Sequence, residues 1–571
     1  MAYSVASLAI AGAIPIAAAF ALMVGLRWSA VRAMGVGWVL ATVLGFGIWQ
    51  MEPTWWAASA IFGGLQAINI TLIVFGAILL MNYLDGSGAI STIRWHFTQI
   101  EGDRRVQLLL IGLGFETIIE GAAGFGTPGA LAAPLFIGLG FPPLGAAVFG
   151  LFFNAPNPPF GAAGTPVIGG IGAVVTDGML PGEMTVSAFE VLSGAWTGLI
   201  TGLTFVFWGF LGVVLLVYWF GSEDERSIGA ALRTSLPIAP FAFTLGIVAG
   251  VVQWGVAWFL GPALPDIAAG FVVLGVGMVM ANQDILIPSG TWDFPDSSKW
   301  NDTWRGGLDL DEIAGDKPSK EMSVLMAWTP YLLVGLLLLV TRWPTLIIDG
   351  QQIVSIVSSY SFGFNVLGYE DLGWSIRYLY LPGTFPFLPI AILTGFLHGM
   401  DTDGMVTAWK DSVEQTIPAA LTLIVAVSMT QVMIQSQVNT ADLIGMMDAL
   451  SQALAAIAGG LLPMVAPWIG ALGSFMTGSN TSSNILFSVL QFNAAGDVGL
   501  SQTIMVALQN TGGGLGNMIS VLNLAAIGGV AGIAGREGDM LRKTIVPTTI
   551  FALWAGFLGM IFVYVLPNAP F

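Results

Sequence analysis

The chain has 571 residues, of which 55% are hydrophobic and only 9% are charged. Soluble domains carry about 25% charged residues, so this composition excludes an ordinary soluble protein and indicates a polytopic helical membrane protein. The apolar runs are about 20 residues long, which fits helices and not the shorter alternating strands of an outer-membrane barrel. The absence of cysteine excludes disulfides and thiolate metal sites, and two histidines disfavour a histidine-rich metal site.

The formal net charge is −17, because Asp and Glu number 34 against 17 Lys and Arg. Such an acidic chain favours a salt-loving source, and the alternative is that the acidic loops only aid solubility. We expect the plasma membrane as the location and the lipid bilayer as the surroundings. We expect no nucleic-acid partner, no metal ion and no other cofactor.

Three apolar runs of spanning length open the chain, at 8–26, 34–50 and 57–81. Basic residues follow the first and the third run: Arg27, Arg32, Arg94, Arg104 and Arg105. The positive-inside rule places both of these links on the cytoplasmic side. Since two helices separate the links, the two assignments agree, and the N-terminus is predicted to lie outside.

Residues 106–140 are long enough to span, but their centre holds Glu116, Glu120, clustered glycines and Pro128. Proline and clustered glycine break helices. We therefore predict a re-entrant hairpin, with one half-helix to about residue 119, a tip, and a second half-helix to residue 140. Residue 120 lies roughly 20 Å along the helix from its cytoplasmic start, near the middle of the membrane. The next span, 144–176, is predicted to break at 154–166 (NAPNPPFGAAGTP).

The remaining spans before the second hairpin are predicted at 188–220, 237–260, 267–281, 324–340, 381–398 and 416–434. A polar linker is predicted at 282–323, and the ambiguous segment 343–380 is a candidate for an amphipathic helix on the outer face. A second hairpin is predicted around 450–492, with its tip in GSNTSSN (478–484). The span that follows, 503–533, is predicted to break at 510–520 (NTGGGLGNMIS), and the last helix covers 547–566.

A hairpin followed by a broken helix therefore occurs twice. By the count of crossings the first hairpin enters from the inside and the second from the outside, which predicts an inverted-topology repeat in an all-α polytopic membrane protein. The chain divides accordingly into N-terminal helices (1–105), the first hairpin and broken helix (106–176), helices that complete the first half (177–281), a cytoplasmic linker (282–323), helices of the second half (324–449), the second hairpin and broken helix (450–533), and the last helix (534–571).

Non-helical backbone at membrane depth occurs only where protein buries it or where it lines a cavity. Corresponding breaks in two halves of a transporter point to its binding site. We expect the four breaks to meet near the midplane and to hold a small anion with half-helix N-termini, bare N–H groups and neutral side chains. The alternative for these side chains is helix–helix hydrogen bonding. The predicted binding residues are Gly124, Gly126, Thr127, Asn154, Asn157, Thr165, Ser479, Asn480, Thr481, Ser482, Asn484, Asn510, Thr511 and Gly513.

No Lys or Arg lies within the four breaks, so the charge of a bound carboxylate has to be balanced by helix dipoles and a co-transported cation. Glu116 and Glu120 lie four residues apart and share a helix face, and a carboxyl group at this depth is a functional-site candidate. We predict Glu120 as the proton carrier, with capping of tip N–H groups as the alternative. Glu116 is a second coupling candidate that is more typical of a packing partner. Sodium is the alternative coupling ion, because carbonyl, Asn, Ser and Thr oxygens suit it.

Six strings resemble the L-lactate permease family and follow its order: EGAAGFGTP (120–128), LGFPP (139–143), GPALPDI (261–267), AWTP (327–330), GSFMTGSNTSSN (473–484) and GREGD (535–539). The Ser-Asn-Thr tip at 479–481 is also similar to the larger ion-transporter superfamily. The resemblance implies proton-coupled uptake of L-lactate or a related small 2-hydroxy monocarboxylate, and it matches Glu120 to a family glutamate. It further implies a homodimer and an elevator-like mechanism, in which 106–176 and 450–533 form a transport domain and 1–105 and 324–449 a scaffold.

Two departures from the family pattern fall in the predicted site. Asn517 stands where the family usually has lysine, with Val521, Leu522 and Asn523 in place of Pro-Gln-Ser, and the family string NTAPVAFG becomes NAPNPPFG at 154–161. These departures leave the identity of the acid open and do not affect the expected fold. A sodium-coupled organic-anion transporter and an anion channel are the alternative functions, and the sequence gives little support to an enzyme.

Overall fold

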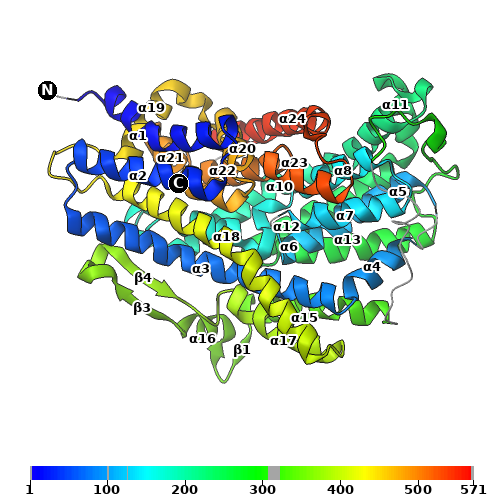
Figure 1. Cartoon of the computed structure of the whole chain (residues 1–571), viewed down its shortest axis with the longest axis horizontal. Coiled ribbons are helices and arrows are strands. Elements are labelled where there is room, and N and C mark those ends of the chain that lie inside the picture. The colour runs from blue at the N-terminus through cyan, green and yellow to red at the C-terminus, as the bar shows by residue number, and fades with distance from the viewer. Residues whose placement is uncertain (1–2, 99–101, 125, 307–321, 567–571) are drawn as a thin grey trace.

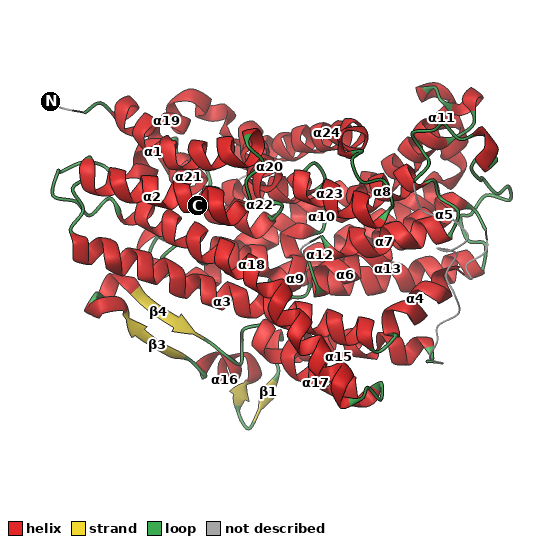
Figure 2. Cartoon of the chain, viewed as in Figure 1, coloured by secondary structure: helices red, strands yellow, loops and turns green. Residues whose placement is uncertain are grey.

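The computed structural model describes residues 3–98, 102–124, 126–306 and 322–566, and it is almost entirely helical (Figure 2). Within these residues, eleven helices are long and apolar enough to cross a membrane. Most of the long helices run along the long axis of the molecule (Figure 1). The prediction of a polytopic helical membrane protein is confirmed.

The chain opens with three long helices at the predicted spans and a shorter fourth one. They are α1 (Val5–Phe20), continued by a π-helical turn (Ala21–Gly25), α2 (Ala30–Gly47), α3 (Pro53–Gly86) and α4 (Ala89–Thr98). Ser4 caps α1, because its hydroxyl accepts a hydrogen bond from the Ser7 N–H at 3.2 Å. Pro53 opens α3, since a proline fits the first turn of a helix, where its missing N–H is not needed.

The first predicted hairpin is a helix–tip–helix unit. Its first arm is helical through α5 (Arg104–Leu109), a π-helical segment (Leu110–Phe115) and α6 (Glu116–Ala122), and its second arm is α7 (Thr127–Gly138). The tip requires Gly124 and Gly126, whose φ angles are +64° and +77°. The two ends of the unit lie together, because Arg104 Nη2 lies 3.3 Å from the position of a Cβ on Gly140. The first arm ends at Ala122 and not at 119, because Gly121 packs against a neighbouring helix instead of ending this one.

The span after this hairpin is broken where the sequence predicts it. It consists of α8 (Pro143–Asn154), a 3-10 turn (Pro158–Phe160), α9 (Gly161–Thr165) and a π-helical segment (Pro166–Ile171). Ala162 and Ala163 have left-handed φ angles of 44° and 51°, and Gly164 has one of 77°. Left-handed backbone strains an alanine by about 1 kcal/mol, so the surrounding packing has to hold this break in place.

Four helices complete the first half: α10 (Val186–Phe220), α11 (Ile228–Ser235), α12 (Ala239–Leu260) and α13 (Pro265–Asn282). α13 lies directly on α6, because a Cβ on Gly121 would stand only 2.7 Å from the Ile267 nitrogen. The described part of the predicted linker 282–323 is anchored by the buried Trp292, Trp300 and Trp304. Residues 307–321 of that linker lie outside the described residues.

The segment between α15 (Val324–Arg342) and α17 (Leu388–Leu397) departs from the all-α prediction. It holds two small antiparallel sheets (Figure 2), made by β1 (Ile347–Ile348) with β2 (Gln351–Gln352) and by β3 (Phe362–Asn365) with β4 (Gly373–Ile376). A helix, α16 (Ile353–Ser359), covers only seven residues of the segment. Aromatic and β-branched residues at alternate positions favour strands, and Phe364 lies opposite Trp374 in the second sheet. The amphipathic helix proposed for 343–380 is therefore limited to α16.

The second half ends in seven helices: α18 (Thr402–Gln435), α19 (Met446–Ala458), α20 (Leu462–Thr477), α21 (Asn480–Asp497), α22 (Gln502–Asn517), α23 (Val521–Val530) and α24 (Glu537–Tyr564). α20 and α21 form the second predicted hairpin, and its tip requires Gly478 with a φ of +71°. The break predicted at 510–520 is wrong for 510–517, because α22 is helical to Asn517 and only 518–520 interrupt the span. Gly512 and Gly516 do not end α22. Both remain helical, and each lies directly against the backbone of α20, where a Cβ would not fit.

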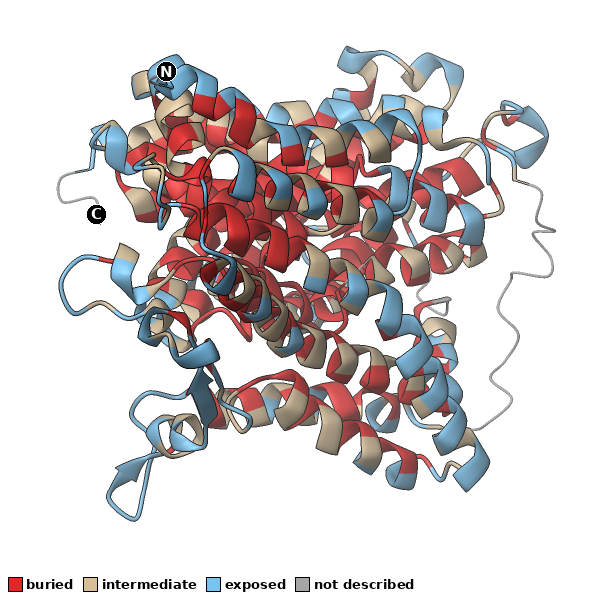
Figure 3. Ribbon diagram, turned by 60° about the vertical axis from the view of Figure 1, so that its left-hand side comes forward, coloured by how far each residue is buried: buried red, intermediate tan, exposed pale blue. Residues whose placement is uncertain are grey.

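Buried residues fill the middle of the molecule, and exposed residues cover its outside (Figure 3). Every residue of α6 and of α8 is buried, so the first hairpin and its broken helix belong to the interior. The outer helices instead expose large apolar side chains, such as Phe259 at 72% and Phe396 at 70%. Exposed aromatic surface of this kind fits contact with lipid and not with water.

Candidate anion-binding site

A small cavity lies where the two hairpins and the two broken helices meet. Its volume is about 20 Å³, which is room for roughly one water molecule. The first hairpin supplies Glu120 and Gly124, and the second supplies the tip residues 478–481. The first broken helix supplies Pro158, Gly161, Ala162, Thr165 and Pro166, and the second supplies Asn517. Four stretches that are up to about 400 positions apart in sequence thus line one cavity.

Within the part of the chain that the structure describes, Glu120 is the only titratable side chain that lines this cavity. It is 2% exposed, and its Oε2 has no hydrogen-bond partner in the described part of the chain. Its Oε1 lies against Gly161, where any side chain would collide with the carboxyl group. No ion pair within the described residues involves Glu120. A buried carboxylate without a cation is costly, so this group has to gain either a proton or a positive partner.

The N-terminus of α21 supplies positive partial charge at the same cavity. Ser479, Asn480 and Thr481 all line it, and they are the cap and the first two residues of an 18-residue helix. The Ser479 hydroxyl accepts a hydrogen bond from the Ser482 N–H at 3.3 Å, which satisfies one of the free N–H groups of the first turn. The remaining first-turn N–H groups and the helix dipole favour an anion at this end.

An amide network ties the second hairpin to both broken helices. Asn480 Nδ2 donates to Asn510 Oδ1 at 2.9 Å, and Asn484 Nδ2 donates to the same oxygen at 2.8 Å and to the Pro166 carbonyl at 2.9 Å. Asn510 Nδ2 in turn lies 3.3 Å from the Pro159 carbonyl. Asn484 and Asn510 do not line the cavity, so their amides hold helices together beside it. This is the arrangement expected of helix–helix hydrogen bonding.

Six predicted residues are brought together around the cavity: Glu120, Gly124, Thr165, Ser479, Asn480 and Thr481. Gly126 and Thr127 instead line a separate cavity of about 240 Å³ that is shared with Asn523 of α23. The other predicted binding residues, Asn154, Asn157, Ser482, Thr511 and Gly513, lie near the breaks but do not line either cavity. Gly513 is pressed against the Asn480 side chain, and Asn157 Oδ1 accepts a hydrogen bond from Thr117 at 3.2 Å.

Two further buried carboxyl groups lie beside Glu120. Glu116 is fully buried one helical turn earlier, and neither of its oxygens has a hydrogen-bond partner among the described residues. Asp266 at the start of α13 is 1% exposed and lies against Gly121. Its Oδ1 accepts a hydrogen bond from Gln253 at 2.7 Å. Sequence reasoning did not single out Asp266, although it belongs to the string GPALPDI and directly precedes the span predicted at 267–281; an acid at the edge of an apolar span is the signal that identifies it.

Three known proteins show what the chain is similar to. A putative L-lactate permease of Haemophilus influenzae is 26% identical, with 92% of this chain and 93% of that protein covered. The glycolate permease GlcA of Escherichia coli K12 is 27% identical, with 98% and 96% covered. Among solved structures, the YdaH transporter of Alcanivorax borkumensis is 12% identical with a TM-score of 0.46, over 88% of this chain and 86% of that one. The sequence model of the L-lactate permease family matches residues 8–566, and the chain therefore belongs to this family.

Proposed function

We propose that this chain imports L-lactate or a related small 2-hydroxy monocarboxylate across the plasma membrane together with protons. The observation that carries the proposal is the pairing of one unpartnered carboxyl group, Glu120, with the N-terminus of α21 across one buried cavity. The relatives are named permeases for L-lactate and for glycolate, which supports a transporter and a hydroxy-acid substrate.

Coupling follows from competition for the same positive helix end. When Glu120 is charged, its carboxylate is the anion that the N-terminus of α21 stabilises, and a second carboxylate is repelled. When Glu120 binds a proton, the helix end is free for the carboxylate of the substrate. Ser479, Thr481 and Thr165 supply hydroxyl groups for the 2-hydroxyl of the acid. Proton and anion therefore bind together, with no net charge carried.

Transport by alternating access is the second part of the proposal. A cavity of about 20 Å³ is smaller than any hydroxy acid, so the substrate enters only after a rearrangement. We propose that the two hairpins and broken helices move as an elevator-like transport domain of an inverted repeat, with the N-terminus outside and the protein as a homodimer. The tight cavity also supports a carrier over the alternative of an anion channel, which needs a continuous path.

Sodium remains the alternative coupling ion, and one observation favours it. Asn480 Oδ1, Asn517 Oδ1 and Ser520 Oγ are buried without a hydrogen-bond partner in the described part of the chain. Neutral oxygens of this kind are suitable ligands for an alkali cation. A cation bound by them would neutralise the substrate as a proton on Glu120 does.

The experiment that tests the function is a counterflow panel in proteoliposomes. Labelled L-lactate outside is exchanged against unlabelled L-lactate, glycolate, pyruvate or acetate inside, with and without sodium. We expect exchange with the two hydroxy acids and weaker exchange with acetate, which lacks the hydroxyl group. Absence of exchange with every acid of the panel would refute the proposal.

A further inference from the structure

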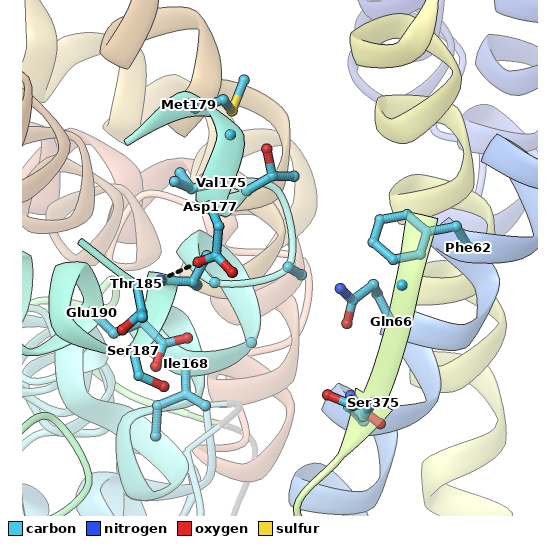
Figure 4. A pocket seen from close by; sticks show the side chains of 18 of the residues that line it. Phe62, Gln66, Ile168, Val175, Asp177, Met179, Thr185, Ser187, Glu190 and Ser375 are labelled. Atoms are coloured by element: carbon cyan, nitrogen blue, oxygen red, sulfur yellow. Dashed lines mark hydrogen bonds between the residues drawn. The ribbon is translucent and has the colours of Figure 1, made fainter. Parts of the chain in front are cut away.

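A second and much larger cavity, of about 760 Å³, lies beside the candidate site. One wall comes from the end of the first broken helix, the loop after it and the start of α10 (Figure 4). The other wall comes from α3, with Phe62 and Gln66, and from β4, with Ser375 (Figure 4). By the positive-inside assignment, this cavity opens on the outer side of the membrane.

Two arginines and one glutamate lie close together at this cavity. Arg377 lines it and is exposed, and its Nη1 donates a hydrogen bond to Ser187 Oγ at 2.9 Å. Glu190 of α10 lines it too, within electrostatic reach of both Arg377 and Arg342. No salt bridge within the described residues joins Glu190 to either arginine. Within the described residues, two guanidinium groups thus lie near one carboxylate, and no ion pair neutralises either of them.

Arg342 has unused hydrogen-bonding capacity. It is 5% exposed at the end of α15, and its guanidinium carbon lies 3.5 Å from the centre of the Tyr380 ring. Its Nη2 donates to the Tyr380 carbonyl, whereas its Nη1 is buried without a partner among the described residues. Tyr380 itself lines the cavity. A buried, unpaired guanidinium N–H calls for an acceptor, best an anionic one, because leaving it unsatisfied costs its full desolvation penalty.

The cavity leads towards the candidate site along one segment of chain. Pro166, the first residue of the π-helical segment, lines the small cavity. The large cavity is lined by Ile168 and Gly169 of the same segment and by Gly172 just after it. Ile70 of α3 packs against Gly169, with a side-chain carbon 2.9 Å from the position of a Cβ there. This contact joins α3 to the first broken helix at the wall of the large cavity.

We propose that the large cavity is an outer vestibule in which Arg377, backed by Arg342, binds the carboxylate of the incoming acid before it reaches the cavity at Glu120. This proposal rests on the proposed function. It supplies the cationic side chain that the four breaks lack. The acids Glu370 and Asp371 also line the vestibule; they are exposed, as Arg377 is, so water screens all three charges, and the hydrogen bond to Ser187 is what holds Arg377 in place. Asp177 accepts a hydrogen bond from the Val186 N–H at 2.7 Å, which partly satisfies its charge.

The test compares charge-removing substitutions within this one cavity by counterflow, which needs no ion gradient. Arg377→Gln is expected to raise the KM for external L-lactate about fivefold at unchanged maximal rate, because it removes one charge-assisted contact on the entry path. Glu190→Gln is expected to lower the KM, because it removes a repelling charge beside the same arginine. Arg377→Lys is expected to restore most of the affinity.

Two matched variants separate charge from structure. Ser187→Ala removes the hydrogen bond to Arg377 but leaves its charge, and it is expected to change the KM by less than about twofold. Lys410→Gln removes an exposed positive charge of α18 that does not line the vestibule, and it is expected to have no effect.

Wild-type exchange combined with an unchanged KM in Arg377→Gln would overturn the vestibule site while leaving the proposed function standing. Absence of exchange by the wild type would instead overturn the proposed function. A raised KM in both Arg377→Gln and Glu190→Gln would indicate a packing effect and would also overturn the vestibule site.

Discussion

Replacing Glu120 by glutamine separates proton coupling from anion binding. The substitution preserves the size of the side chain, and the neighbouring Gly161 leaves space for it. The amide cannot take up a proton, so binding of the anion no longer requires one. Since Glu120 is the only titratable side chain among the described residues that line the cavity, we expect one proton per anion in the wild type. A pH step of one unit, which corresponds to about 1.4 kcal/mol, then accumulates L-lactate about tenfold at equilibrium.

In proteoliposomes with an inside-alkaline pH step and no sodium, we therefore expect about tenfold accumulation by the wild type and about onefold by Glu120→Gln. Counterflow by the mutant is expected to continue, because the N-terminus of α21 still binds the carboxylate. Glu414→Gln on the exposed face of α18 is the matched control, and it is expected to behave like the wild type. Tenfold accumulation by Glu120→Gln would refute the assignment of Glu120 as the proton carrier.

Three other predictions concern stability and the coupling ion. Asn484→Ala removes the hydrogen bonds to the Pro166 carbonyl and to Asn510 Oδ1, which keeps its bond from Asn480, and the loss should destabilise the protein by about 1–3 kcal/mol, seen as a lower melting temperature in detergent. Gly512→Ala places a Cβ against the backbone of α20 and should cost about 1–3 kcal/mol, whereas Gly529→Ala, with nothing within 4 Å of its Cβ, should cost nothing. Replacing sodium by choline should leave pH-driven accumulation unchanged, and its loss would favour the sodium alternative.

The breaks were predictable from the sequence where glycine is required by the backbone itself. Gly124, Gly126 and Gly478 stand at positions with positive φ, and each lies in a short stretch rich in small and polar residues within an otherwise apolar span. That local pattern is visible without tertiary structure. It predicted both hairpins and the break after the first one. It also predicted that Glu120 lies beside the second tip.

The error at 510–517 has the opposite origin. Gly512, Gly513 and Gly516 are glycines because α20 and the Asn480 side chain approach them too closely for a Cβ, and the helix itself continues. Sequence alone does not distinguish a glycine that ends a helix from one that admits a neighbour. The same limit applies to the vestibule, whose walls come from α3, α10 and the segment around β4. Arg377 and Arg342 become neighbours of Glu190 only through tertiary packing.

The distribution of close contacts defines which parts can move together. α20 and α22 are joined through their glycine contacts, and the Asn484 amide joins this unit to Pro166 of the first broken helix. Another close contact joins α6 to α13 at Gly121. Facing this assembly across the vestibule is α3, which meets the broken helix at the contact of Ile70 with Gly169.

We infer that the sliding surface of the proposed elevator follows the vestibule, since movement there breaks few contacts, whereas movement between the hairpins disrupts the buried amide network. An Ile70→Ala variant should therefore loosen this contact and raise the rate of exchange without weakening the hairpins. An unchanged exchange rate with a lowered melting temperature would place the sliding surface elsewhere.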